Sequence, residues 1–319
     1  MLDVSVIVPV CNAGEYLKPC LESISAQTFR SFECICVENG STDGSGAVLR
    51  EHAAKDSRFK VLDIGKAGAA AARNRGIDAA VGRYLMFLDA DDLFVPQMLE
   101  KLFARAESSG ADIVFCQHQI YATETKTLRD CIGAAFPEID PRVRYPFRTV
   151  KGLALQAYSP CPWNKFFRAD FVRREGLRFQ SLPSANDTYF TSVAKIVARS
   201  CATVPDVLVH YRTGQASNIT AKVHKDPSCV VRALSAIWEE VVRRGLDTLL
   251  LDRFVEFSGP NLLYTVKLVR DDRDAFVKYL DFLRESPVVR FLDGKSRGCF
   301  LRLSPVPARQ QRLLLAEHW

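Results

Sequence analysis

Residues 85–92 read LMFLDADD, so four apolar residues lead directly into a segment with three carboxylates, Asp89, Asp91 and Asp92. Such an apolar run is typical of a buried strand, and ligands of open α/β sheets bind at the carboxyl ends of strands. Neighbouring carboxylates repel one another unless a cation intervenes, and hard divalent ions prefer oxygen ligands that they often share with phosphates. The stretch therefore predicts a metal and diphosphate site at Asp89 and Asp91. A solvated acidic turn that caps the next helix is the alternative.

Short β-branched runs alternate with helical stretches on both sides of this segment. Strands and helices that alternate in this way build a mostly parallel, Rossmann-like sheet flanked by helices, so we expect an α/β fold. The predicted strands are residues 4–8, 32–37, 59–64, 84–88 and 113–116, and the predicted helices are 16–26, 48–54, 68–80 and 96–108.

The second half of the chain is less regular. Residues 121–150 carry prolines and charges without a sustained period, which predicts a long loop over the sheet. A helix near 187–198 and a strand at 202–212 follow, and the remainder reads as several helices. We therefore expect an α/β domain over residues 1–215 and a helical C-terminal appendage over residues 216–319.

The composition narrows the class of protein. Of 319 residues, 48% are apolar and 25% charged, which is typical of folded soluble proteins. The net charge of +6 is spread along the chain. This distribution argues against a nucleic-acid binder and is compatible with an anionic small ligand or an anionic membrane surface.

The ten cysteines contain no C-x-x-C pair, so no zinc or redox motif is indicated. Without a secretory signal or a run of roughly 18 uncharged apolar residues, we expect a cytoplasmic protein, at most peripheral on the inner membrane face.

Two further segments follow predicted strands and are dense in small residues. VENGSTDGS, residues 37–45, forms a turn that brings backbone N–H groups close to a ligand; Ser41 or Asp43 as a plain helix cap is the alternative. GAAAARNRG, residues 68–76, starts a helix in which Arg73 and Arg75 lie on different faces. At most one arginine therefore points inward, toward a phosphate or the carboxylates.

These stretches, in this order, resemble the family 2 glycosyltransferases of the GT-A fold. The similarity covers residues 3–118 closely and 160–213 more loosely. The matching blocks are VSVIVPVCN at 4–12, VENGSTDGS at 37–45, AARNRGI at 71–77 and FLDADD at 87–92.

The resemblance implies a role for individual residues. The family's catalytic base falls on Asp187, which follows Asn186 where an acidic residue is usual; the missing like charge favours the ionised form of Asp187. Asp91 and Asp89 match the metal signature. The residues implied to bind the nucleotide sugar are Pro9, Val10, Asn12, Asn39, Arg73, Asp89 and Ala90.

The resemblance also implies the reaction. A hexosyl or N-acetylhexosaminyl group leaves a nucleotide donor, and Mn²⁺ or Mg²⁺ stabilises the charge that develops on the diphosphate. Asp187 takes the proton of an acceptor hydroxyl that attacks the opposite face, which inverts the anomeric configuration. Many relatives have an aspartate at Asn39 that accepts the uracil N3–H. An asparagine can still accept through its carbonyl oxygen and can also donate, so a UDP-sugar is favoured. The acceptor is a saccharide or lipid-linked saccharide, as in polysaccharide biosynthesis.

Two residues carry weaker signals. Trp163, in PWNKFF, stacks against an acceptor sugar or fills the core. His210, in VHYR, is expected to close a strand, where it contacts substrate or is structural. The basic and apolar tail at 281–319 suits an anionic bilayer, packing against the α/β domain, or a homodimer contact.

Two other functions stay open. A sugar nucleotidylyltransferase also uses an α/β fold with a carboxylate-bound metal, but it needs a glycine-rich basic loop that residues 10–15 lack. A catalytically silent module that binds sugar nucleotides or glycans is the other alternative, for which Asn186 is the one hint.

Overall fold

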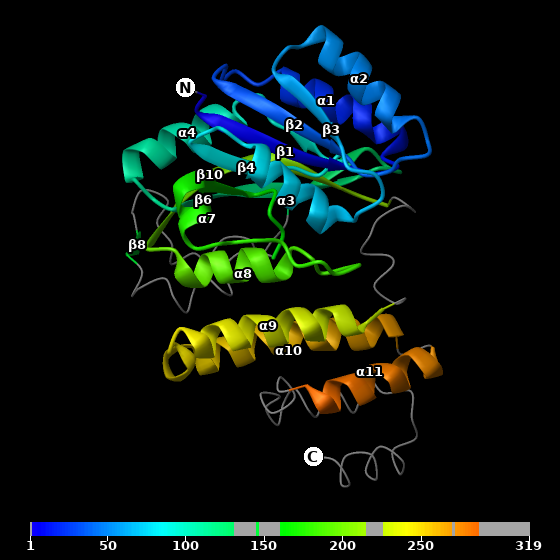
Figure 1. The fold of residues 1–319 in the computed structure, drawn as a ribbon, viewed down its shortest axis with the longest axis vertical. Coiled ribbons are helices and arrows are strands. Elements are labelled where there is room, and N and C mark those ends of the chain that lie inside the picture. Colours follow the sequence, from blue (N-terminus) through cyan, green and yellow to red (C-terminus); the bar gives the residue numbers. More distant parts are fainter. Residues whose placement is uncertain (1, 131–144, 147–159, 215–225, 270–271, 287–319) are drawn as a thin grey trace.

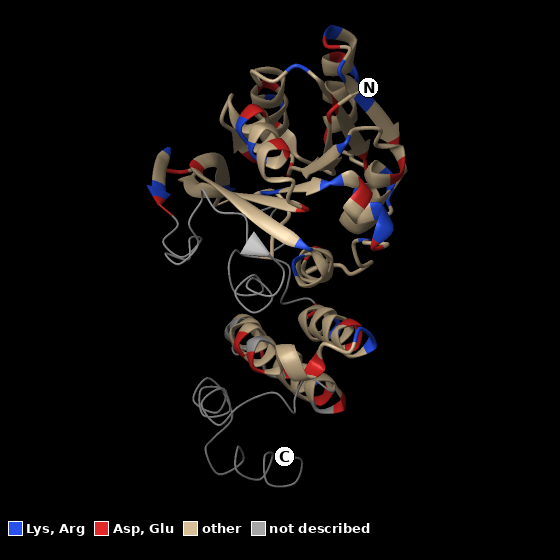
Figure 2. Cartoon of the chain, turned by 90° about the vertical axis from the view of Figure 1, so that its left-hand side faces the viewer, with Lys and Arg blue, Asp and Glu red and all other residues tan. Residues whose placement is uncertain are grey.

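The computed structural model describes residues 2–130, 145–146, 160–214, 226–269 and 272–286 (Figure 1). A mixed sheet lies at its centre, and helices cover both of its faces. Basic and acidic residues are interspersed along the described chain (Figure 2), which agrees with the spread-out charge of the sequence. Within the described stretches, no helix is both long enough and apolar enough to cross a membrane.

The strands of the described chain join into one sheet in the order β3-β2-β1-β4-β9-β6-β10-β5, with β7 on β6 and β8 on β10. β1, β2, β3 and β4 run parallel, as do β6 and β10, whereas β9 is antiparallel between β4 and β6. The carboxyl ends of β1, β2 and β4 therefore meet at one edge. The strands are β1 (Val4–Val10), β2 (Phe32–Glu38), β3 (Phe59–Asp63), β4 (Tyr84–Phe87), β5 (Leu93–Phe94), β6 (Ile113–Ala122), β7 (Thr127–Asp130), β8 (Tyr145–Pro146), β9 (Lys165–Arg168) and β10 (Ser200–Thr213).

Alternation along β1 decides which helices cover which face, because successive side chains of a strand point to opposite sides. Val6 and Val8 pack in one buried cluster with α1 and α4, and Ile7 packs in another with α3, α7 and α8. The helices are η1 (Gly14–Tyr16), α1 (Leu17–Ser25), α2 (Ser45–Lys55), α3 (Ala69–Ala79), α4 (Met98–Ser109), α7 (Ala169–Arg174), α8 (Thr188–Val197), α9 (Ser228–Arg243), α10 (Asp247–Val269) and α11 (Arg273–Glu285).

Helix α3 lies close to β1 because Gly76 has no side chain. A Cβ atom at Gly76 would lie 2.3 Å from Cγ2 of Ile7, which is far inside van der Waals contact. This close approach brings Arg73, one turn earlier on α3, toward the carboxyl edge of the sheet.

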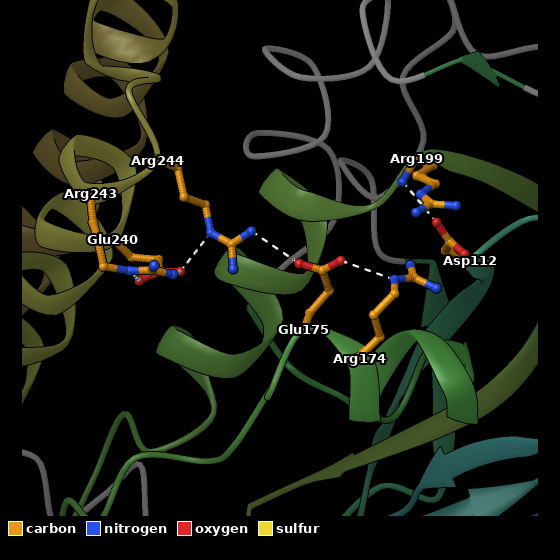
Figure 3. Close-up of polar contacts among 7 residues, drawn as sticks. All are labelled: Asp112, Arg174, Glu175, Arg199, Glu240, Arg243 and Arg244. Atoms are coloured by element: carbon orange, nitrogen blue, oxygen red, sulfur yellow. Dashed lines mark hydrogen bonds and ion pairs between the residues drawn. The ribbon is translucent and has the colours of Figure 1, made fainter.

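The C-terminal helices pack beneath α8 (Figure 1). Phe190 of α8 belongs to the same buried cluster as Trp238 of α9, Phe254 of α10 and Phe276 of α11. At the rim of this contact Arg244 donates to Glu175 at 3.0 Å and to Glu240 at 2.6 Å, which ties the end of α9 to the end of α7 (Figure 3). The predicted boundary at 215/216 falls outside the described residues and stays a prediction.

The structure confirms the predicted α/β fold with helices on both faces and a helical C-terminal part. Each of the predicted strands and helices up to residue 116 is present, with ends shifted by a few residues. The expected loop at 121–150 is partly wrong, since β6 continues to Ala122 and turns back into β7. Strands β5 and β9 were not predicted, because two to four residues carry too little periodicity to detect. The tail at 287–319 lies outside the described residues.

Candidate active site

The turns after β1 and β2 are bound to each other at the carboxyl edge. Asn12 adopts φ 51°, which asparagine tolerates, and its Oδ1 accepts from the backbone N–H of Thr42 at 2.7 Å. Its own N–H donates to Oγ of Ser41 at 3.1 Å. Asp43 accepts from the N–H of Gly14 at 2.8 Å as well as from the start of α2. Ser41 and Asp43 therefore hold the turn that follows β1. Capping of a helix, which was the alternative for these residues, does not describe their whole role.

At the end of β1, Val10 meets its neighbours at the carboxyl edge through its backbone carbonyl and not through its side chain. The side chain of Val10 is fully buried in the core, and its carbonyl accepts from the N–H of Asn39 at 2.9 Å. Pro9 is partly exposed, and it lies beyond the stretch of β1 that pairs with β4. A ligand at this edge would therefore meet the ring of Pro9 rather than the side chain of Val10.

The side-chain oxygen of Asn39 already has two partners. It accepts from the backbone N–H groups of Ala67 at 2.8 Å and Gly68 at 2.9 Å, just before α3. A carbonyl oxygen has two lone pairs, so both are used. Of the two roles expected for Asn39, accepting a base proton is therefore not available to its oxygen, and donation from its amide nitrogen is the contact that a ligand could make.

Arg73 joins three parts of the chain. Its guanidinium donates to Asp89 Oδ1 at 2.7 Å and to Asn186 Oδ1 at 2.8 Å, and lies 5.3 Å from the ring centroid of Phe179. Arg73 is buried and Arg75 is exposed, which confirms that only one of the two points inward. The contact brings the end of β4 and the loop before α8 together at α3. Nε of Arg73 is buried and makes no hydrogen bond to the described residues.

The acidic turn after β4 holds its carboxylates close together. Burial, and then the neighbouring Asp89 carboxylate, raise the pKa of Asp91 to about 6. Asp92 is fully buried; one of its oxygens accepts from the N–H of Arg212 at 2.8 Å, and burial followed by Asp91 and Asp89 raises its pKa. Ala90, between Asp89 and Asp91, is 8% exposed.

The donor set of this turn fits a divalent cation. A nearby divalent ion would relieve the repulsion that raises the pKa of Asp91, and Mg²⁺ is commonly bound by one or two carboxylates together with substrate phosphates. Across the part of the chain that is described, no three His, Cys, Asp or Glu side chains are grouped so as to hold a metal by themselves.

Arg212 supports the acidic turn and was not singled out from the sequence. Its Nε donates to the carbonyl of Asp91 at 2.8 Å, and its guanidinium lies 5.0 Å and 4.9 Å from the ring centroids of Tyr16 and Tyr121. It stands two residues after His210 in the strand, which is the one signal that could have drawn attention to it. Arg212 is only 7% exposed, so its hydrogen bond to the carbonyl of Asp91 is largely shielded from water.

Asp187 stands at the N-cap of α8, yet its side chain caps no N–H of that helix. The carboxylate is therefore free of the usual role of aspartate at this position. Two residues earlier, Ala185 adopts φ 51°, a left-handed conformation that is unfavourable for alanine. Such strain often marks a functional segment.

The pKa of Asp187 lies above its ordinary value. From the sequence we expected Asn186, by removing a like charge, to favour the ionised form of Asp187. In the structure burial raises the pKa of Asp187, and Asp89 raises it further, while Arg73 acts in the opposite direction. Burial is the largest influence on this pKa, and the uncharged Asn186 adds no repulsion to it.

The two weaker candidates lie on or beside β10. Trp163 is 4% exposed and stacks on Tyr211, with ring centroids 5.2 Å apart and an interplanar angle of 14°. This is the core position that the sequence left open, and a sugar contact stays a prediction. His210 pairs with Leu93 and does not close the strand, because β10 continues to Thr213; burial lowers the pKa of His210.

The fold and these contacts define an α/β protein whose polar groups meet at the carboxyl edge of the sheet. Residues 5–175 match the family described as glycosyl transferase family 2, more than half of the chain. The chain belongs to this family, which confirms the resemblance that the motifs suggested.

Individual relatives agree with this assignment. EpsH of Bacillus subtilis, which bears the name of a glycosyltransferase, is 33% identical over 213 residues, or 66% of this chain and 60% of its own length. This chain therefore aligns with only part of that relative.

Solved structures share the fold. TarS of S. aureus in complex with UDP-GlcNAc has a TM-score of 0.70 at 20% identity, covering 99% of this chain and 92% of that one. A mannosyltransferase from Pyrobaculum calidifontis in complex with GDP-Man and Mn²⁺ has a TM-score of 0.52 at 16% identity, covering 98% and 85%.

Proposed function

We propose that this chain is a glycosyltransferase that moves a sugar from a nucleotide-sugar donor to a hydroxyl group of an acceptor. The observation that carries the proposal is the contact of Arg73 with both Asp89 and Asn186, which brings Asp187 to the edge of the acidic turn. A general base can take the proton of the acceptor hydroxyl, and a cation held by carboxylates can stabilise the leaving diphosphate, so this set of groups suits such a transfer. The solved relatives that bind UDP-GlcNAc and GDP-Man with Mn²⁺ support a donor of this class.

Asp89 and Asp91 would hold a Mn²⁺ or Mg²⁺ ion, which when bound would neutralise the charge that develops on the leaving diphosphate. Arg212 orients this turn through the carbonyl of Asp91. Asn12 and Asn39 fix the two turns that would border the nucleotide, and Pro9 offers an apolar surface to it.

Asp187 is the proposed general base. Its carboxylate accepts the proton of the acceptor hydroxyl while the hydroxyl oxygen forms a bond to the anomeric carbon and the bond to the diphosphate breaks. Attack from the face opposite the leaving group inverts the configuration in one displacement. The raised pKa of Asp187 suits a base that works near neutral pH.

The proposed donor is a UDP-sugar, and the proposed acceptor is a saccharide or a lipid-linked saccharide of a polysaccharide pathway. A cytoplasmic location with peripheral membrane contact, and a homodimer, belong to the same proposal. Trp163 and His210 remain candidate acceptor contacts.

A ligand screen on the full chain tests the proposal. Binding to the folded state raises the melting temperature, so we expect one of UDP-, GDP- or dTDP-sugars to do so in the presence of Mn²⁺. Slow release of the nucleoside diphosphate, with water as acceptor, should follow for that donor. A shift without any release over a long incubation would favour a silent binding module. Formation of nucleoside triphosphate and sugar phosphate after pyrophosphate is added would favour a nucleotidylyltransferase.

A further inference from the structure

Lys165, the first residue of β9, is a completely buried lysine. A buried ammonium group needs partners, because losing its hydration is unfavourable. Its Nζ donates to the carbonyl of Cys161 at 2.6 Å and to Oδ1 of Asn164 at 2.7 Å, and lies 5.8 Å from the ring centroid of Phe115. The ammonium group therefore holds the segment that precedes β9.

The same segment is held from the other side by α8. Thr191, also fully buried, directs its hydroxyl at the carbonyl of Pro160 at 2.7 Å and at the carbonyl of Asp187 at 2.9 Å. Pro160 and Cys161 are adjacent in sequence. Lys165 and Thr191 thus hold consecutive carbonyl groups, and through Thr191 this contact reaches the backbone of Asp187.

Three charged groups act on Asp187 from separate elements. Arg73 comes from α3, Asp89 from the turn after β4, and Lys165 from β9. Arg73 already donates to Asp89 and Asn186, so its charge is shared. Lys165 contributes a further positive charge from β9, and Asp187 in turn opposes the lowering of the pKa of Lys165 that burial causes.

We propose that Lys165 is a positioning residue for Asp187: its ammonium group secures the Pro160–Cys161 segment, which Thr191 joins to the backbone of Asp187 in the first turn of α8, and it adds a buried positive charge to those that act on the carboxylate. The inference rests on the proposed function, in which Asp187 is the base. Because the side chain of Asp187 makes no cap contact in its own helix, its placement depends on such neighbours.

The charge of Lys165 is tested with Lys165→Met, which keeps much of the side-chain volume. The readout is the pH dependence of kcat for Mn²⁺-dependent hydrolysis of UDP-GlcNAc, or of the UDP-, GDP- or dTDP-sugar that gives the largest melting shift. We expect the acidic limb to move up by about one pH unit, because a stabilising positive charge is lost. The KM for the donor should change less than twofold. Saturating Mn²⁺ keeps Asp91 from contributing to the limb.

Lys195→Met is the matched control. Lys195 lies on α8, is 1% exposed, and has its Nζ 5.9 Å from the ring centroid of Phe257. The groups that act on its pKa after burial are Lys165, Cys161 and Cys201, not Asp187. We expect this variant to lose a comparable amount of thermal stability and to keep the wild-type acidic limb. An unchanged limb in Lys165→Met, or an equal shift in Lys195→Met, overturns the proposal.

Thr191→Val tests the positioning contact without removing a charge, and it serves if Lys165→Met does not fold. We expect kcat to fall at least about tenfold with little change in KM, because a misplaced catalytic group slows the reaction more than it weakens binding. Thr265→Val is the control: Thr265 is fully buried on α10 and donates to the carbonyl of Asn261 at 3.1 Å. Equal kcat in the two variants contradicts the proposal.

Asp187→Asn separates the two possible failures. If this variant keeps the wild-type rate, the assignment of the base is wrong and the proposed function must be revised. If it is inactive while Lys165→Met and Thr191→Val behave like their controls, only the positioning role of Lys165 is wrong.

Discussion

Arg73 donates a hydrogen bond of 2.8 Å from its guanidinium to Oδ1 of Asn186, across 113 positions of sequence. The bond is buried and joins α3 to the loop that leads into α8. It makes the placement of Asp187, the next residue, depend on α3. Several properties of the protein should depend on this contact and on those around it.

Removing the acceptor of this bond should destabilise the protein. Asn186→Ala leaves one guanidinium N–H of Arg73 buried without its partner, which typically costs about 1–3 kcal/mol. Chemical denaturation measures the loss in unfolding free energy. Asn186→Asp retains an acceptor and should keep most of the stability. Equal stability of the Ala variant and the wild type would show that Arg73 does not need this partner.

The two proposed functions of the carboxylates can be separated by mutation. Asp91→Asn should abolish Mn²⁺-dependent binding of the donor, whereas Asp187→Asn should keep that binding and lower the rate about 10²–10⁴-fold, as expected for a general base. Calorimetry and release of nucleoside diphosphate measure the two effects. Asp170→Asn, which removes a carboxylate that is 86% exposed, is the control and should change neither. Loss of donor binding in Asp187→Asn would contradict this division of roles.

Without a bound metal ion, Asp91 should make the protein less stable at neutral pH than at about pH 4. Burial and Asp89 raise the pKa of Asp91 to about 6 from its ordinary value near 4, so the folded protein binds this proton more tightly than the unfolded chain. The stabilisation is present below about pH 4 and is lost as the pH rises to about 6. Urea denaturation without divalent ions should therefore show the stability difference between Asp91→Asn and wild type growing in favour of the variant over this range. Parallel pH profiles of the two proteins would argue against a raised pKa.

The close packing of α3 on β1 should not tolerate a methyl group at position 76. Gly76→Ala places a Cβ 2.3 Å from Ile7, and overpacking of a buried contact costs about 1–3 kcal/mol. Gly46→Ala is the matched control on α2, where the nearest atom is 3.4 Å away at the flexible end of Arg50. Since alanine favours helix over glycine, this control should be neutral or stabilising. Thermal unfolding distinguishes the two, and an equally tolerated Gly76→Ala would place α3 farther from β1.

The order of elements could be predicted because each leaves a local pattern. The apolar run at 85–88 predicts β4, and leucines at helical spacing predict α1, without reference to the rest of the chain. The two-residue β5 and the short β9 leave no such pattern, since Lys165 and Arg168 at the ends of β9 are charged. The lysine is buried there because β9 lies between two other strands, β4 and β6, and this arrangement is visible only in the tertiary structure.

By itself, the sequence determined the α/β class, the family and the segments at which polar residues gather, because periodicity and motif spacing are properties of the linear chain. Only the tertiary structure decided the hydrogen-bonding state of the side chains. It engaged the oxygen of Asn39 with two backbone N–H groups, joined Arg73 to Asn186 and Asp89, and raised the pKa of Asp187 by burial. Burial and long-range contacts set charge and hydrogen bonding, and both arise only when residues distant in sequence are packed together.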